Sequence, residues 1–90
     1  MKRILTTGRF EMDVTTLAIR RGLAVQRLWT LVDHLARGEQ LAPRHRPRRP
    51  GGEWQNCREC HIAPDWLLIW REDETQLILV RTGSNADLFG

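Results

Sequence analysis

A proline-rich basic segment in the middle of the chain constrains the fold more than any other feature. Between Glu39 and Gly52 lie three of the four prolines, two glycines and four arginines, and all four arginines fall within Pro43–Pro50. Proline removes a backbone donor and fixes φ, so this composition blocks both a helix and a central strand. We therefore expect an exposed basic loop here. Residues 1–90 are predicted to form one domain, because ninety residues hold a single thin core and no repeat or linker is visible.

Two amphipathic helices are predicted before this loop. Apolar residues recur at helical spacing in two stretches, Phe10, Val14, Leu17 and Ala18 in the first and Ala24, Leu28, Leu31, Val32 and Leu35 in the second. Gly22 and Gly38 follow these stretches and supply the helix stops. The β-prone stretch Ile4–Thr7 comes first and is predicted to form an edge strand. The helices should form a hairpin whose apolar faces turn the same way, toward a sheet.

Three strands are predicted after the loop, near Glu53–Ile62, Trp66–Trp70 and Gln76–Arg81. Pro64 and the acidic run Glu72–Glu74 mark the turns between them. Trp66–Trp70 is apolar throughout, which is typical of a central strand buried on both faces. The predicted fold class is α+β with the order β-α-α-β-β-β, a helical hairpin packed on a mainly antiparallel four-stranded sheet.

Charge is distributed unevenly along the chain. The formal net charge is +3, but residues 1–54 hold eleven basic and five acidic groups whereas residues 55–90 hold three and six. The basic half is the expected face for phosphates, although surplus arginine also serves solubility in small domains. No apolar run approaches the roughly 20 residues of a spanning helix, and the apolar stretch after Met1–Arg3 is too short for a secretory signal. We expect a cytoplasmic protein without membrane contact.

The two cysteines form part of a Cys-x-x-Cys-His sequence, Cys57 to His61, which is also the attachment signature of c-type haem. Haem attachment requires export, and no export signal is present, so this interpretation is disfavoured. A zinc site would be one ligand short, because His34 and His45 are distant in sequence. We expect reduced thiols that pack in the fold, no metal and no cofactor.

Motifs in about the last forty residues carry a family resemblance. Residues 59–66 are Glu-Cys-His-Ile-Ala-Pro-Asp-Trp, residues 81–90 are Arg-Thr-Gly-Ser-Asn-Ala-Asp-Leu-Phe-Gly, and Gly-Glu-Trp lies upstream at 52–54. This part of the chain resembles the YafQ-like branch of the RelE/ParE superfamily, toxins of bacterial toxin–antitoxin pairs that cut messenger RNA on the ribosome. The first half fits the family only as a pattern of elements, with Arg9, Phe10 and Asp13 at a similar place near the first helix. The resemblance implies a RelE-like fold.

Cutting RNA without a metal needs a base for the 2′-hydroxyl proton, an acid for the leaving oxygen and a cation for the charge between them. His61 ends one predicted strand, Asp65 begins the next, and Arg81 closes the last, so the connections can bring them to one edge. The resemblance implies that His61, Asp65, Arg81 and Phe89 line the cleft, with acid–base, charge-stabilising and base-stacking roles. It also places Trp66 beside the cleft, where its ring could stack on a base.

Each of these residues also has an ordinary explanation. Arg81 could simply pair with Glu59 or Asp87, and an aspartate after proline is common in turns. Phe89 could anchor the end of a strand, and the other tryptophans, Trp54 and Trp70, are expected to be packing residues.

Two positions depart from the family pattern. Asn85 stands where the family usually has a histidine, and its amide cannot transfer a proton near neutral pH. Loss of one such group costs about 10²–10⁴ in rate, so either the chain is weakened or inactive, or another residue has taken the role. A gapless alignment from Trp54 backwards also places Arg48 where many relatives have histidine. His45 lies on the same loop, three residues earlier, and is the candidate to replace it.

The loop is also the expected RNA-binding segment. Its basic residues would attract the phosphate backbone without reading sequence, and a mobile solvated loop is the equally simple alternative. The residues predicted to bind RNA are Arg44, His45, Arg46, Arg48, Arg49 and Trp66; those predicted to be catalytic are His61, Asp65, Arg81, Asn85 and Phe89.

The resemblance implies a ribosome-dependent mRNA endoribonuclease of a type II toxin–antitoxin system, acting by metal-independent attack of the 2′-hydroxyl and leaving a 2′,3′-cyclic end. It implies a cognate antitoxin, the ribosome and mRNA as partners. Two alternatives stay open at this point. One is a non-catalytic toxin-like module that binds an antitoxin or RNA; the other is a ParE-like protein acting on gyrase, disfavoured because such relatives lack the His-x-x-x-Asp-Trp arrangement.

Overall fold

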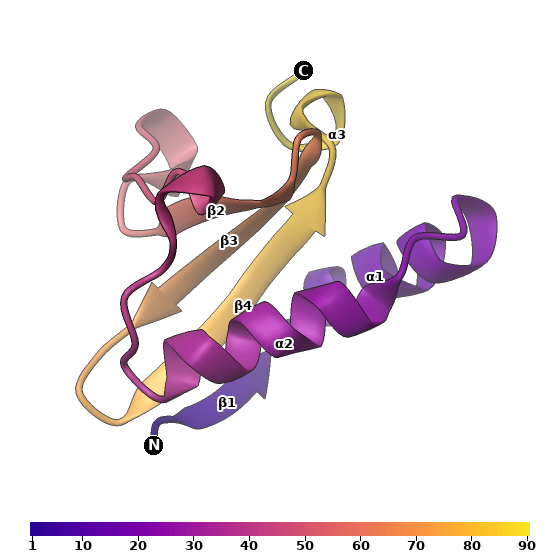
Figure 1. Ribbon diagram of the computed structural model, residues 1–90. Coiled ribbons are helices and arrows are strands. Elements are labelled where there is room, and N and C mark those ends of the chain that lie inside the picture. The colour runs from indigo at the N-terminus through magenta and orange to yellow at the C-terminus, as the bar shows by residue number, and fades with distance from the viewer.

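A four-stranded sheet in the order β1-β4-β3-β2 organises the computed structural model, which describes all residues 1–90. The strands are β1 (Arg3–Thr6), β2 (Arg58–Ala63), β3 (Trp66–Glu72) and β4 (Gln76–Gly83), and the helices are α1 (Gly8–Arg20), α2 (Val25–Ala36) and α3 (Asn85–Phe89) (Figure 1). Two short 3₁₀ turns, η1 (Pro43–His45) and η2 (Gly52–Trp54), lie in the proline-rich segment. The predicted α+β order is confirmed, with one further helix at the end.

The sheet is mainly antiparallel, as predicted. β2, β3 and β4 pair antiparallel in sequence, whereas β1 pairs parallel to β4 from Arg3 opposite Gln76 to Thr6 opposite Leu79. A parallel neighbour needs a crossover connection, and here it runs through α1, α2, β2 and β3. The first strand of the chain therefore lies beside the last one.

Local sequence signals explain where the two long helices begin and end. The Thr7 side chain accepts a hydrogen bond from the backbone N–H of Phe10 at 3.0 Å, which satisfies one of the free donors at the start of α1. Gly22 and Gly38 follow the helices with φ of +62° and +76°, a conformation that glycine adopts without steric cost. None of the helices is long and apolar enough to cross a membrane.

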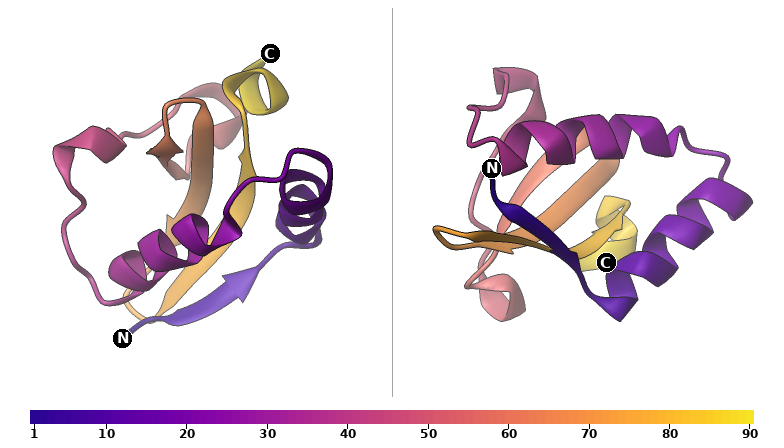
Figure 2. Two further views of the ribbon diagram at one scale, coloured as in Figure 1. Left: turned by 45° about the vertical axis from the view of Figure 1, so that its right-hand side comes forward. Right: turned by 90° about the horizontal axis from the view of Figure 1, so that it is seen from below.

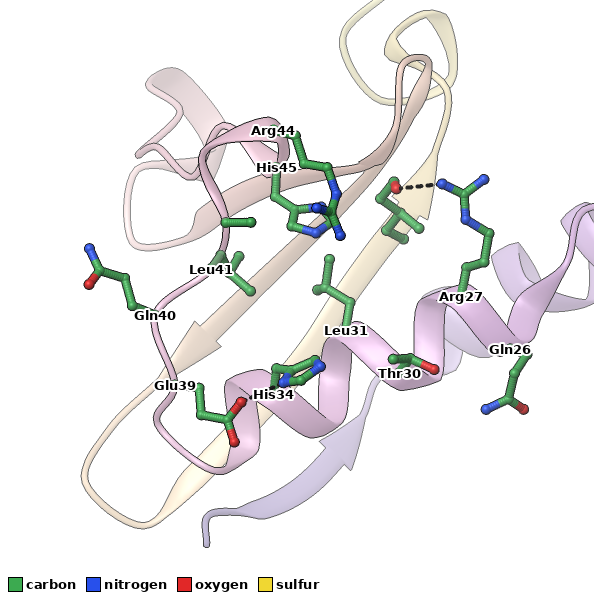
Figure 3. A pocket seen from close by; sticks show the side chains of 12 residues that line it. Gln26, Arg27, Thr30, Leu31, His34, Glu39, Gln40, Leu41, Arg44 and His45 are labelled. Atoms are coloured by element: carbon green, nitrogen blue, oxygen red, sulfur yellow. Dashed lines mark hydrogen bonds and ion pairs between the residues drawn. The ribbon is translucent and has the colours of Figure 1, made fainter.

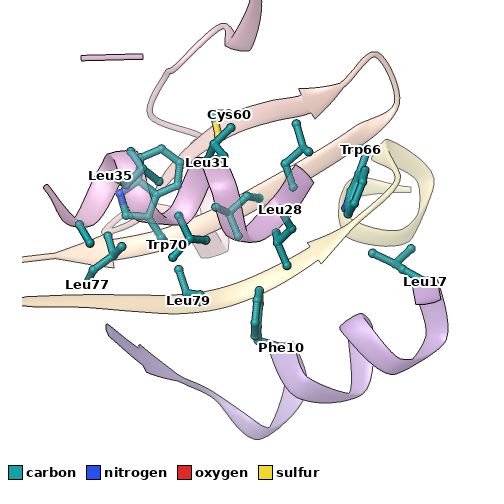
Figure 4. Close-up of a cluster of buried hydrophobic side chains, with 14 residues drawn as sticks. Phe10, Leu17, Leu28, Leu31, Leu35, Cys60, Trp66, Trp70, Leu77 and Leu79 are labelled. Carbon is teal, nitrogen blue, oxygen red and sulfur yellow. The ribbon is translucent and has the colours of Figure 1, made fainter. Parts of the chain in front are cut away.

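One face of the sheet carries the main hydrophobic core (Figure 4). Both long helices contribute to it, with Phe10 and Leu17 from α1 and Leu28 and Leu31 from α2 among its members. The sheet contributes the alternate residues Trp66, Leu68 and Trp70 of β3 together with Leu77 and Leu79 of β4. The prediction that the apolar faces of the two helices turn toward the sheet is confirmed.

The opposite face of β3 is buried as well. Leu67 and Ile69 join a second cluster with Cys57 and Leu88, and Trp54 packs against it. Figure 2 shows η2 on the side of the sheet away from α2. All five residues of Trp66–Trp70 are at most 2% exposed, which confirms the prediction of a central strand buried on both faces.

The two cysteines belong to different layers of the fold. Cys60 is in the main core and Cys57 is in the second cluster, and both are free and buried. The sequence prediction that they pack in the fold as thiols agrees with this placement.

Two segments differ from the sequence prediction. The strand expected from Glu53 begins only at Arg58, because residues 52–54 form a 3₁₀ turn after Gly52, whose φ is +63°. Residues 85–89 form a short helix that the apolar pattern did not indicate. Its start is fixed by Ser84, whose side chain accepts from the Asp87 N–H while the Asp87 carboxylate accepts from the Ser84 N–H.

Candidate functional site

Asp65 and Asn85 meet where the β2–β3 turn approaches α3. The Asp65 carboxylate accepts a hydrogen bond of 3.1 Å from the backbone N–H of Asn85, the first residue of the helix. The contact therefore uses the backbone of Asn85 and leaves its amide side chain free. The structure brings together two residues, 20 positions apart, that the sequence placed in the same site.

His61 lies on the face of the sheet that α3 covers. It pairs with Leu67 in the β2–β3 register, and paired residues direct their side chains to the same face. Leu67 packs in one cluster with Leu88 of α3. His61 is partly exposed, and its Nδ1 atom is buried without a hydrogen-bond partner. His61, Asp65 and α3 thus share this side of the sheet, which we call the α3 face.

An ion pair that the sequence analysis missed ties α3 to the end of α1. Arg21 donates from Nη1 and Nη2 to the two carboxylate oxygens of Asp87, at 2.7 and 3.0 Å. These hydrogen bonds hold the pKa of Asp87 well below its ordinary value, and the bond to Asp87, with a smaller contribution from the charge of Asp65, raises the pKa of Arg21. Arg21 is therefore a cation near Asp65, but its guanidinium is occupied by Asp87.

Gly83 makes this arrangement possible, since it lies directly against the Asp87 side chain. A Cβ atom at position 83 would be 3.0 Å from both Cβ and Oδ2 of Asp87. Any larger residue would displace the carboxylate that caps α3.

Arg81 pairs with Ile69 in the β3–β4 register, on the same face of the sheet as His61, but its guanidinium is bound by an aspartate of α1. Its guanidinium donates to both oxygens of Asp13 on α1, at 2.7 and 3.2 Å, and the backbone N–H of Thr82 donates to the same carboxylate at 3.1 Å. The two side chains are only 14% and 13% exposed. Arg81 therefore pairs neither with Glu59 nor with Asp87, and its charge is neutralised on the α1 side. The charge-stabilising role of Arg81 stays a prediction.

Trp66 also differs from its expected role. It is 2% exposed and belongs to the main core, where its indole N–H donates to Thr82 Oγ1 at 3.0 Å. A base cannot reach a ring buried in this way, so Trp66 is a packing residue and the prediction of base stacking is corrected. Phe89, in contrast, is 40% exposed at the end of α3, and its ring is accessible.

The two parts of the basic loop contact different elements of the fold. The first part lines a groove beside α2. This groove has a volume of about 490 Å³ and lies between α2 and η1, with Leu31 opposite Arg44 and His45 (Figure 3). His45 donates from Nδ1 to the His61 carbonyl at 2.6 Å, because a carbonyl oxygen can only accept. Arg27, which the sequence analysis did not single out, donates to the Ile62 carbonyl at 3.3 Å. Neither Arg27 nor Arg44 has a carboxylate partner.

The second part of the loop is joined to β2 through Arg48. Arg48 and Glu59 exchange two backbone hydrogen bonds of 2.9 and 2.8 Å, and Arg48 Nε donates to Glu59 Oε1. Glu59 is fully buried, whereas the Arg48 side chain is 63% exposed. Arg46 has a left-handed φ of 46°, and neither Arg46 nor Arg49 pairs with a carboxylate. The loop is therefore attached to the sheet at Arg48 and not solvated along its whole length.

Some of the missed partners had a signal in the sequence. Ser84 and Asp87 are three apart, which is the spacing of a capping box, and this pattern predicts a helix start. The Arg21–Asp87 and Arg81–Asp13 pairs span 66 and 68 residues, and no sequence pattern indicates them. No three His, Cys, Asp or Glu side chains gather closely enough to hold a metal ion.

Comparison with known proteins agrees with the motifs and the fold. A sequence model described as the YafQ bacterial toxin of type II toxin–antitoxin systems matches residues 2–90. The mRNA interferase toxin YafQ of Escherichia coli strain K12 is 33% identical over 85 residues, covering 93% of this chain and 91% of that protein. YafQ from E. coli strain BL21(DE3) has a crystal structure with a TM-score of 0.90 and 31% identity, covering 100% of both chains. A chain of the E. coli DinJ–YafQ complex gives 0.89 and 31%, again covering 100% of both. The chain therefore belongs to the YafQ family of bacterial toxins of type II toxin–antitoxin systems.

Proposed function

We propose that this chain is an mRNA interferase, an endoribonuclease that cuts messenger RNA on the ribosome without a metal ion. The observation that carries the proposal is the hydrogen bond from the Asn85 N–H to Asp65. It holds α3, which bears the exposed ring of Phe89, against the connection between His61 and Asp65. The family membership and the name of the E. coli relative support the same activity.

The proposed reaction is attack of the ribose 2′-hydroxyl on the adjacent phosphate, which releases the 5′-oxygen of the next nucleotide and leaves a 2′,3′-cyclic phosphate. His61 and Asp65 share the two proton transfers, one removing the 2′-hydroxyl proton and the other protonating the leaving oxygen. Asn85 contributes a backbone N–H to Asp65 but no titratable group. Phe89 stacks on a base. The ribosome positions the messenger, so that few catalytic groups suffice.

We also propose an antitoxin as the partner of this chain. The similarity to a chain of the E. coli DinJ–YafQ complex extends over all residues of both chains, which supports a comparable toxin surface. Such a partner would be tested by co-expression with the neighbouring coding sequence and co-purification of the complex.

The test of activity is primer-extension mapping of cleavage in a purified translation system. Asp65→Asn is the most informative variant, because the amide oxygen can still accept the Asn85 N–H and preserve the α3 contact while proton transfer is lost. Asp65→Asn and His61→Gln should each lower the cleavage rate by about 10²–10⁴. Equal cleavage by all three proteins would remove His61 and Asp65 from the mechanism.

Asn85→His is the matched gain-of-function variant. If it cleaves faster than the chain with Asn85, the asparagine at position 85 weakens the nuclease site of the unaltered chain. Absence of cleavage by both forms would refute the nuclease proposal. The chain would then be a non-catalytic module that binds an antitoxin or RNA, the alternative that the amide at position 85 favours.

A further inference from the structure

Two side chains from outside the sheet hold the end of β2 by its backbone carbonyl groups. His45 of η1 donates from Nδ1 to the His61 carbonyl at 2.6 Å. Arg27 of α2 donates from Nη2 to the Ile62 carbonyl at 3.3 Å. We propose that His45 and Arg27 are positioning residues of the nuclease site. By holding these two carbonyls they fix the backbone that joins His61 to Asp65, and their role rests on the proposed nuclease function.

The end of β2 needs such donors because the sheet does not supply them all. β2 is an edge strand, and its register with β3 shifts between His61 and Ala63, which leaves Ile62 without an opposite residue. A bulge of this kind leaves the extra residue unpaired and bends the strand. Backbone carbonyls outside the ladder require other donors when they are removed from water. The two side chains therefore replace, at this end, the neighbour that the strand lacks.

The bulge lies directly before the turn that carries Asp65. β2 ends at Ala63, and β3 begins at Trp66. The Ile62 side chain is buried in the main core, whereas the His61 side chain lies on the α3 face. A shift of the backbone at the bulge would therefore move His61 and Asp65 relative to each other. Proton transfer requires each group within hydrogen-bond reach of the substrate, and a misplacement of about 1 Å can cost about 10² in rate.

Both donors come from segments with a fixed conformation. Arg27 lies in the first turn of α2, next to Leu28, which is fully buried in the main core. η1 is closed by a hydrogen bond of 3.0 Å from the Arg46 N–H to the Pro43 carbonyl, and His45 is its last residue. These side chains and the β2–β3 turn enclose a hollow of about 310 Å³ that no carboxylate lines. No acidic group therefore competes for the two donors.

The role requires a hydrogen-bond donor at position 45 and not a charge. A carbonyl oxygen can only accept, so the Nδ1 atom of His45 carries a proton in either charge state of the ring. That nitrogen is therefore unavailable as a base for the 2′-hydroxyl proton. An asparagine side chain places its amide nitrogen the same number of bonds from the backbone and cannot become charged. His45→Asn is consequently the variant that separates positioning from acid–base catalysis and from phosphate binding.

The first experiment follows the turn by NMR in the protein without RNA. His45→Ala and Arg27→Met remove one donor each. Each variant should shift the amide resonances of Asp65 and of Asn85, because the Asn85 N–H donates to the Asp65 carboxylate. His45→Asn should keep the resonances of the unaltered chain, since it keeps a donor for the carbonyl.

Arg3→Met is the control for Arg27→Met, because it makes the same change at an exposed arginine of β1, at the other edge of the sheet. It should leave the resonances of the turn in place. Far-UV circular dichroism and the urea midpoint of each variant exclude general unfolding as the cause of a shift. If Arg27→Met and His45→Ala also left the turn unchanged, the two side chains would not hold it and the proposal would be overturned.

The second experiment measures cleavage of ribosome-bound messenger by the same proteins. His45→Ala and Arg27→Met should each lower kcat about tenfold with KM changed less than about threefold, because misplaced groups weaken the transition state while binding of the messenger is kept. His45→Asn should retain kcat within about threefold of the unaltered chain. Failure of this rescue, or a rise in KM at constant kcat, would give His45 a charge-dependent or RNA-binding role and overturn the proposal.

The two experiments separate the positioning role from the nuclease function itself. If the unaltered chain does not cleave messenger, the nuclease function fails, and the NMR comparison alone decides whether these side chains hold the turn. Cleavage by the unaltered chain together with an unchanged kcat in His45→Ala and Arg27→Met would refute the positioning role and leave the nuclease function standing.

Discussion

Asp13 joins the first helix to the last strand through three hydrogen bonds, two from Arg81 and one from the Thr82 N–H. β1 pairs with β4 only as far as Leu79, so beyond this point the edge of β4 has no neighbouring strand. The Asp13 carboxylate takes over as acceptor there. At the scale of residues, the Arg81–Asp13 pair therefore links β4 to α1.

Asp13→Ala should lower the free energy of unfolding by about 2–4 kcal/mol, because it leaves a partly buried guanidinium and a backbone N–H without an acceptor. Urea denaturation monitored by tryptophan fluorescence measures the change. Glu11→Ala on the same helix is the control, since its contact with Thr6 is exposed and 3.2 Å long. A cost for Asp13→Ala no larger than for Glu11→Ala would contradict the structural role of the pair.

The motifs identified the residues of the site better than the partners of those residues. His61, Asp65 and Asn85 could be placed together because they flank a short turn and the C-terminal motif, and the Asp65–Asn85 contact agrees with that prediction. Asp13 is 68 residues from Arg81, and the spacing of charges carries no information about such a contact. The burial of Trp66 follows from the alternation of β3, whose even-numbered residues face the helices. The family resemblance had instead predicted that Trp66 lies beside the cleft.

At the scale of elements, α3 is held by electrostatic contacts more than by buried area. Only Leu88 of its five residues is buried. The Ser84–Asp87 capping box fixes its start, Arg21 attaches it to the end of α1, and Asp65 attaches it to the β2–β3 turn. Acid should therefore release this helix before it unfolds the sheet.

The direction of the pH dependence follows from the lowered pKa of Asp87. An unfolded aspartate titrates near pH 3.9, so the contribution of Asp87 to α3 docking is fully present above about pH 5 and is lost as the pH falls toward its lower folded pKa. Amide exchange of Leu88, followed by NMR from about pH 6 to about pH 3, should show this loss. The measurement is made in Asp65→Asn, so that the neighbouring carboxylate does not titrate. Asp87→Asn should be weakly protected at every pH; a drop of the same size in that variant would contradict the role of Asp87.

The elements that periodicity defines were predicted well, and those that contacts define were not. α1 and α2 have clear apolar spacing and glycine stops, and both agree with the prediction. β2 begins later than predicted because Trp54 packs from a 3₁₀ turn onto the second cluster, which β-propensity cannot indicate. A five-residue helix such as α3 is too short to show an apolar period, and only its capping box was readable.

At the scale of the whole molecule, the sheet separates a large core from a small one. The main core contains fourteen buried residues between the sheet and the two long helices, and the second contains four beneath η2 and α3. Regions with few buried apolar contacts open with a smaller free energy than the core. The face that carries the proposed active site should therefore open first.

The two free cysteines report on these layers separately. Cys60 is fully buried in the main core, and burial raises the pKa of its thiol to about 12; Cys57 is 7% exposed in the small cluster, and burial raises the pKa of its thiol as well. Since only thiolates react, both should resist alkylation in the native state.

Cys57 should be labelled through local opening of η2 and α3, and Cys60 only at the rate of global unfolding. Mass spectrometry of the single variants Cys57→Ala and Cys60→Ala, alkylated over a urea series, gives both rates. If the rates were equal and followed global unfolding, the two faces would open together and the α3 face would not be the less stable layer.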